Sequence, residues 1–239
     1  MLLAFLWGGL AACSLLIGYA LAGRGLSQRT IGVIMGIGAG ALISAIAYEL
    51  VPESVLAGQG MGLAFLLGAL AFFAGDWIID RRGGADRKDI AGGQPGGSGA
   101  AIFVGTLLDN VPESIILGMS LAVGGAVNLA FLAAVFVSNL PEGLAGSLNL
   151  VTAGHSHRQV FRMWTLLVLI SAACAALGYV LVSQLPYAEG LYAKAFAAGA
   201  MLTMLADAMM PEAFQHGGKL VGLFTVIGFL AAAVLSFIQ

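Results

Sequence analysis

The sequence predicts an all-α, polytopic membrane protein with eight transmembrane helices. Of its 239 residues, 60% are apolar and only 9% are charged, and the mean hydropathy is +0.98. A soluble domain carries about a quarter charged residues, so an ordinary soluble protein is excluded. The apolar runs are continuous rather than alternating, which excludes a closed β-barrel. The expected surroundings are the lipid bilayer, and the few scattered charges predict no nucleic-acid partner.

Eight spans follow from the apolar runs and from the Gly-rich or charged breaks between them, at about 20 residues a span. The predicted helices cover 2–22, 31–51, 61–80, 100–122, 126–150, 160–183, 190–211 and 218–238. We expect a single transmembrane domain over 1–239. A Gly- and charge-rich cytoplasmic loop at 81–99 divides it into three helices at 1–80 and five at 100–239.

Basic residues gather on one side of the predicted bundle. Lys194 and Lys219 are assigned to the other side, and the remaining eight lie in or beside the first, third and fifth connections: Arg24, Arg29, Arg81, Arg82, Arg87, Lys88, Arg158 and Arg162. The positive-inside rule places those three connections in the cytoplasm. We therefore expect a multi-pass protein of the plasma (inner) membrane with both termini outside the cytoplasm.

An internal repeat relates the second and seventh helices. The segment GALISAIAYELVPES at 40–54 aligns with GAMLTMLADAMMPEA at 199–213, so that Gly40 falls on Gly199 and Glu53 on Glu212. An even- and an odd-numbered helix cross the membrane in opposite senses, so the repeat is predicted to be inverted, as in many transporters. The fourth and fifth helices carry a related pair of motifs of their own. A 3+2+3 inverted-repeat bundle follows, with those two helices in the middle.

The paired motifs are DNVPES at 109–114 and SNLPEG at 138–143, both inside apolar runs where an ionisable group marks a functional site. Spacings of three and four residues place their polar side chains on one face of each helix. Pro112 and Pro141 cannot donate to the preceding turn, so each is expected to bend its helix and free a carbonyl oxygen. The candidate site residues are Asp109, Asn110, Glu113, Ser138, Asn139 and Glu142.

These side chains predict a site for a cation. No Lys or Arg occurs between 99 and 157 to pair with the three acids. Clustered acids repel one another unless protons or a metal cation neutralise them. All-oxygen ligands suit hard ions such as Mg, Ca or Mn, whereas Zn prefers sites with His or Cys.

Weaker candidates lie along the rest of the chain. A second tier of possible pathway residues comprises Glu49, Glu53, Asp76, Asp207 and Glu212. For Glu53 and Glu212, near predicted helix ends, snorkelling to the interface is an equal alternative. His155 and His157 form a GHSH loop that either collects metal or is only solvated. Methionines of the seventh helix are core residues or thioether ligands for a soft metal: Met201, Met204, Met209 and Met210.

The eight spans, the outside termini, the 3+2+3 layout and the HNxPEG-like motifs resemble the ZIP (Zrt/Irt-like) metal transporters. The resemblance implies a binuclear site midway across the membrane, with Asp109, Glu113, Ser138 and Glu142 at one metal, Asn110 and Asn139 at the other, and both glutamates bridging. It also implies transport into the cytoplasm by an elevator-like motion, often in a homodimer. Asp109 and Ser138 stand where the family usually has His, which indicates a divergent bacterial-type member.

Three function classes compete. The leading prediction is a carrier of a divalent cation (Zn, Mn, Fe, Co or Cd) by alternating access around Glu113 and Glu142, with no prosthetic group. The second, motivated by the missing histidines, is a carrier or sensor of a non-metal solute on the same fold. The third is an intramembrane hydrolase using paired acids. FAGD at 73–76 is not GxGD and no HExxH occurs, so we predict that the chain is not an enzyme.

Overall fold

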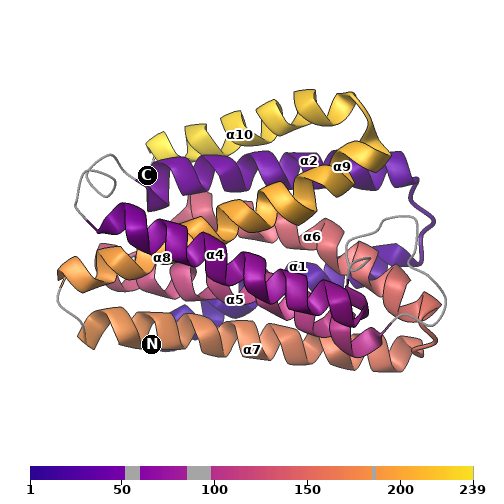
Figure 1. The fold of residues 1–239 in the computed structure, drawn as a ribbon, viewed down its shortest axis with the longest axis horizontal. Helices are drawn as coiled ribbons and strands as arrows, with labels where there is room; N and C mark the ends of the chain where they lie inside the picture. Colours follow the sequence, from indigo (N-terminus) through magenta and orange to yellow (C-terminus); the bar gives the residue numbers. More distant parts are fainter. Residues whose placement is uncertain (52–59, 85–97, 185–186, 239) are drawn as a thin grey trace.

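The structure is a computed structural model that describes residues 1–51, 60–84, 98–184 and 187–238. Over these residues the chain forms eight long helices running along one axis of the molecule (Figure 1). The elements are α1 (Leu2–Ala22), α2 (Gln28–Ala45) with the π turn η1 (Ile46–Leu50), α4 (Met61–Ile79) with η2 (Asp80–Gly84), α5 (Gly99–Gly124), α6 (Leu129–Thr152), α7 (His157–Gln184), α8 (Tyr187–Met204) with η3 (Leu205–Met209) and α9 (Met210–Gly217), and α10 (Leu220–Ile238). Each of the eight is long and apolar enough to cross a membrane, which confirms the predicted fold class.

Side-chain caps explain why two helices, α2 and α7, begin earlier than predicted. Helix α2 begins at Gln28 because the hydroxyl of Ser27 accepts the N–H of Thr30 at 3.1 Å. Helix α7 begins at His157, ahead of the predicted start at 160, because Ser156 and Gln159 form a capping box. The GHSH segment therefore contains the N-terminal cap of α7.

The seventh span is longer than predicted. It was expected to end at 211, but η3 and α9 carry it to Gly217. Pro211 lies in the first turn of α9, directly after the π turn η3, and it does not stop the helix. Pro112 and Pro141 likewise lie inside continuous helices, α5 and α6.

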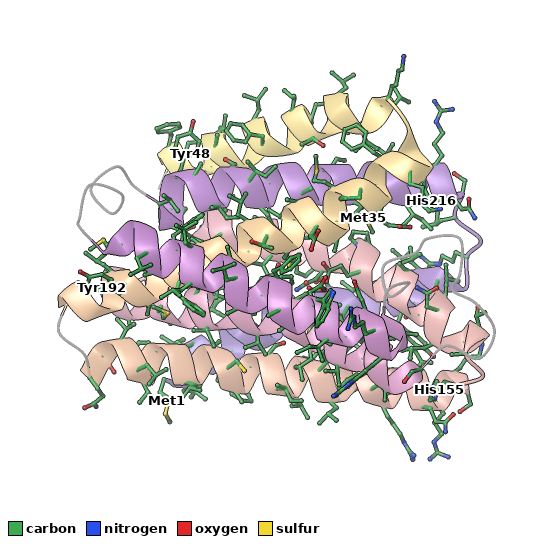
Figure 2. All side chains as sticks on the ribbon, viewed as in Figure 1. Met1, Met35, Tyr48, His155, Tyr192 and His216 are labelled. Atoms are coloured by element: carbon green, nitrogen blue, oxygen red, sulfur yellow. The ribbon has the colours of Figure 1, made fainter. Side chains whose placement is uncertain are left out.

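Both ends of the chain lie at the same end of the bundle (Figure 1). Figure 2 places Met1, Tyr48 and Tyr192 at this end, which we call the termini end, and His155 and His216 at the opposite end, the histidine end. Lys219 follows α9 directly and so lies at the histidine end. The sequence prediction that put it on the same side as Lys194 was wrong, because the connection before α10 is odd-numbered, like the other basic ones.

Helices pack in four main pairs: α2 with α10, α4 with α8, α1 with α6, and α5 with α7. Among the eight spans, those of α6 and α2 are the most buried, and those of α4 and α10 are the most exposed. Exposed leucines and phenylalanines on the outer helices fit a lipid surface rather than water. The two helices that carry the candidate motifs, α6 and α5, are the first and third most buried of the eight spans.

The structure repeats itself in the second and seventh spans. Their π turns begin at Ile46 and Leu205, two positions that the sequence repeat aligns with one another. The glycine contacts repeat as well. A Cβ on Gly40 would lie 1.9 Å from the carbonyl oxygen of Thr225 in α10, and one on Gly199 would lie 1.9 Å from that of Phe65 in α4. Equivalent glycines therefore bring equivalent helix pairs into backbone contact.

Candidate functional site

The structure brings the six motif side chains of α5 and α6 into the interior of the bundle. Each is exposed by 2% or less of its surface. Helices α5 and α6 contact one another, and both motifs lie near the middle of their spans. We call this set the polar cluster: Asp109, Asn110, Glu113, Ser138, Asn139 and Glu142. Burying three carboxyl groups at membrane depth is energetically costly, so their presence here marks a candidate functional site.

The depth of each cluster residue follows from the antiparallel connection between the two helices, which runs from the C-cap Gly125 to the N-cap Asn128. At the helical rise of about 1.5 Å per residue, Glu113 of α5 and Asn139 of α6 are both about 17 Å from that connection. Asn110 and Glu142 lie about one turn further from it, at about 22 Å. Each glutamate is therefore level with the asparagine of the other helix, and the cluster has two layers about 5 Å apart.

Two amide oxygens of the polar cluster accept no hydrogen bond from the residues that the structure describes. In the part of the chain that the structure describes, neither the Oδ1 nor the Nδ2 of Asn139 has a hydrogen-bond partner. Asn110 donates from Nδ2 to the carbonyl of Thr106 at 3.0 Å, and no described residue donates to its Oδ1. Ser138 donates to the carbonyl of Val135 at 2.9 Å and keeps its own oxygen as an acceptor. Buried amide oxygens that accept no hydrogen bond can serve as ligands for a cation.

The described residues contain no group of three or more His, Cys, Asp or Glu arranged to hold a metal ion. A cation in this structure would therefore need the amide and hydroxyl oxygens of the cluster as well as its carboxylates. Oxygen donors of this kind are the ones that hard divalent cations take.

Helix α2 and the π turn η3 approach the polar cluster from the side. A Cβ on Gly38 would lie 2.8 Å from the Cα of Ser138 and 3.2 Å from the methyl carbon of Met209. The absence of a side chain at Gly38 thus lets α2 contact the motif of α6 directly. Met209 is fully buried, and its methyl carbon lies beside Gly38. Met209 was among the candidates predicted from the sequence, whereas Gly38 was not, because its only signal was its place in a glycine-rich helix.

Two second-tier residues mark opposite ends of the bundle. Glu49, in η1, accepts hydrogen bonds from Asn128 and Ser236 and lines a cavity of about 240 Å³ at the termini end. Glu212, in α9, pairs with His216 at 2.9 Å at the histidine end. The polar cluster lies between them along the bundle axis.

The other second-tier residues are placed differently. Asp76 is buried in α4, exposed by 4%. Asp207 is exposed in η3, on the surface of the bundle. Glu53 lies outside the described residues. The two loop histidines sit apart from the cluster: His155 packs against Gly99, and the ring of His157 lies 6.5 Å from that of Tyr19.

The chain was compared with known proteins. No family model matches it. It is 28% identical, over 201 residues, to a protein of Arabidopsis thaliana named "Putative zinc transporter". The match covers 80% of this chain but only 31% of the relative, so the chain spans about a third of that protein's length. That name describes a transporter rather than an enzyme. The predicted resemblance is confirmed in this form: the chain has a homologue so named, and its eight apolar helices fit a ZIP-like membrane protein.

Proposed function

We propose that the chain carries a divalent metal cation across the membrane by alternating access to the polar cluster. The observation that carries the proposal is the burial of six polar side chains, three of them acidic, near the middle of the contacting helices α5 and α6. The name of the Arabidopsis relative supports the choice of a metal as the transported solute.

The cluster chemistry favours a divalent ion. Glu113 and Glu142 supply the charge, because one divalent cation neutralises two carboxylates that would otherwise repel one another in a low dielectric. Asn110 and Asn139 supply neutral oxygens, one in each layer. Each of the two layers, about 5 Å apart, offers one glutamate and one asparagine, which allows one ion in each layer. Zinc or another transition metal such as Mn or Fe is the proposed cargo, and Met209 adds a soft donor beside the oxygens.

The direction of transport follows from the charged residues at the two ends. Glu49 offers a carboxylate in the termini-end cavity, and Glu212 offers one at the histidine end. Basic residues gather at the histidine end, and the positive-inside rule makes this end cytoplasmic. The proposed movement is therefore from the outer termini end, past Glu113 and Glu142, into the cytoplasm of a cell with this protein in its plasma membrane.

The repeated π turns and glycine contacts support the proposed 3+2+3 inverted repeat. Two halves of similar structure and opposite orientation can exchange conformations, which opens the central site first to one side and then to the other. A homodimer is part of the same proposal, because the resemblance to the ZIP transporters implies one.

Uptake into proteoliposomes tests the function. Zn, Mn, Fe, Co and Cd are supplied separately, and accumulation is followed with a metal-sensitive dye inside the vesicles. Glu113→Gln and Glu142→Gln keep the shape of the side chain but remove its charge, so uptake should fall about 10- to 100-fold or more. Ser183→Ala, an exposed position on α7, should leave uptake unchanged. No uptake of any of these ions, with uptake of an organic cation instead, would replace a metal with a different solute.

A further inference from the structure

A polar connection between helix pairs lies at the termini end of the bundle. Glu49, partly buried in η1, accepts a hydrogen bond through Oε2 from the Nδ2 of Asn128 and one through Oε1 from the hydroxyl of Ser236. Ser236 belongs to α10, the packing partner of α2, so that bond stays within one pair. Asn128 belongs to the start of α6, whose packing partner is α1. The Glu49–Asn128 bond therefore joins two pairs.

Asn128 has a second bond that fixes its own helix. Its Oδ1 accepts the N–H of Phe131 at 2.7 Å, which caps the beginning of α6. One amide thus uses its oxygen to hold α6 and its nitrogen to hold Glu49. Any movement of the start of α6 away from the end of α2 has to break the bond to a carboxylate, which is stronger than a neutral hydrogen bond.

The Glu49–Asn128 bond lies beside a cavity on the termini side of the polar cluster. The termini-end cavity is lined by Glu49, Asn128 and Lys194, and by the apolar side chains of Leu50 and Phe131, both of which are exposed by only 1%. Phe131 is about two turns of α6 before Ser138, about 10 Å along the helix. The cavity therefore lies over the cluster on the same helices, and buried apolar side chains separate the two.

We propose that Asn128 is a positioning residue: through Glu49 it holds the start of α6 against the end of α2, and so keeps the polar cluster closed from the termini end. Lys194 lines the same cavity as Glu49 and Asn128, so this cavity brings a cationic side chain to the carboxylate that Asn128 binds. The inference goes beyond the proposed function, because it assigns a conformational role to a residue that contacts no cargo and is independent of what the chain transports.

Thiol accessibility tests the role directly. Cys13 and Cys174 are replaced by Ala, and Val135→Cys provides a buried reporter on α6, between Asn128 and the cluster. A membrane-impermeant thiol reagent is added from the face at which an N-terminal tag is accessible, and the labelling rate is measured.

Three variants separate the hydrogen bond from the helix cap. Asn128→Asp keeps an oxygen that caps α6 but replaces the donor with a second carboxylate, so labelling should accelerate about tenfold or more. Asn128→Ser also keeps a cap without adding charge, and labelling should rise by less. Asn128→Asp combined with Glu49→Gln exchanges the donor and the acceptor, which allows the bond to form in the reverse sense. Labelling should then return to within about twofold of the starting rate.

Two results would overturn the proposal: an unchanged rate in Asn128→Asp, or a double variant that labels as fast as Asn128→Asp alone. If Asn128→Asp does not give a monodisperse protein, an unchanged rate in Asn128→Ser decides against it. The labelling needs no cation. A failure of metal uptake therefore leaves this test intact, and a negative result here leaves metal transport open.

Discussion

Replacing Asn139 with Leu should make the cation-free protein more stable and remove its response to metal. The amide of Asn139 is 1% exposed, and neither of its polar atoms is hydrogen-bonded within the described residues. A buried polar group without a partner costs about 1–3 kcal/mol. Leu has the same branched arrangement of four side-chain heavy atoms and no polar atom, so Asn139→Leu should recover about 1–2 kcal/mol of that cost. For a chain of this length, this corresponds to a rise of about 2–8 °C in Tm.

Thermal unfolding in detergent, with and without Zn or Mn, measures both effects. A metal present at about a hundred times its Kd stabilises the wild type by about 2.7 kcal/mol, and Asn139→Leu should lose most of this increment. Ser171→Ala is the matched control: its hydroxyl is also buried without a hydrogen bond among the described residues, but it lies on α7, outside the cluster. It should rise slightly in Tm and keep its metal response. A lower Tm in Asn139→Leu together with an intact metal response would show that Asn139 is a structural residue, and the reasoning would fail.

Three further substitutions follow from single contacts. Gly38→Ala places a Cβ 2.8 Å from the Cα of Ser138, so it should lower metal uptake about tenfold by displacing α2 from the cluster, as measured in proteoliposomes. Ser156→Ala removes the cap of α7 and should cost about 1 kcal/mol in thermal unfolding while uptake stays normal, which separates the GHSH loop from metal binding. Trp164→Phe loses a buried 2.8 Å hydrogen bond to a serine hydroxyl and should cost about 1–2 kcal/mol in the same unfolding assay.

Most of the fold could be predicted because membrane helices are encoded locally. A run of about 20 apolar residues has to be helical in lipid, where backbone groups have no other partner. The burial of Glu113 and Glu142 could be expected on the same ground, since their side chains share faces with other polar groups inside such runs. Both are buried in the structure.

Contacts between distant segments could not be predicted. Asn128 and Glu49 are 79 residues apart, and Ser236 and Glu49 are 187 apart. No local pattern marks these pairs, because a helix-capping asparagine looks the same whether or not its amide nitrogen reaches another helix. The approach of Gly38 to Ser138 is of the same kind: it depends on how α2 and α6 cross, and a single sequence does not contain that information.

Equal energetic costs at two glycines would support the inverted repeat. A Cβ on Gly40 would lie 1.9 Å from the carbonyl oxygen of Thr225, and one on Gly199 would lie 1.9 Å from that of Phe65. Backbone atoms cannot move aside as a side chain can, so each Ala substitution should force two helices apart and cost about 3 kcal/mol or more. Gly62→Ala, whose Cβ meets nothing within 4 Å, should be neutral or slightly stabilising. If thermal unfolding finds one of the two substitutions costly and the other harmless, the two halves do not pack by a common rule, and the alternating access proposed from their symmetry loses its structural basis.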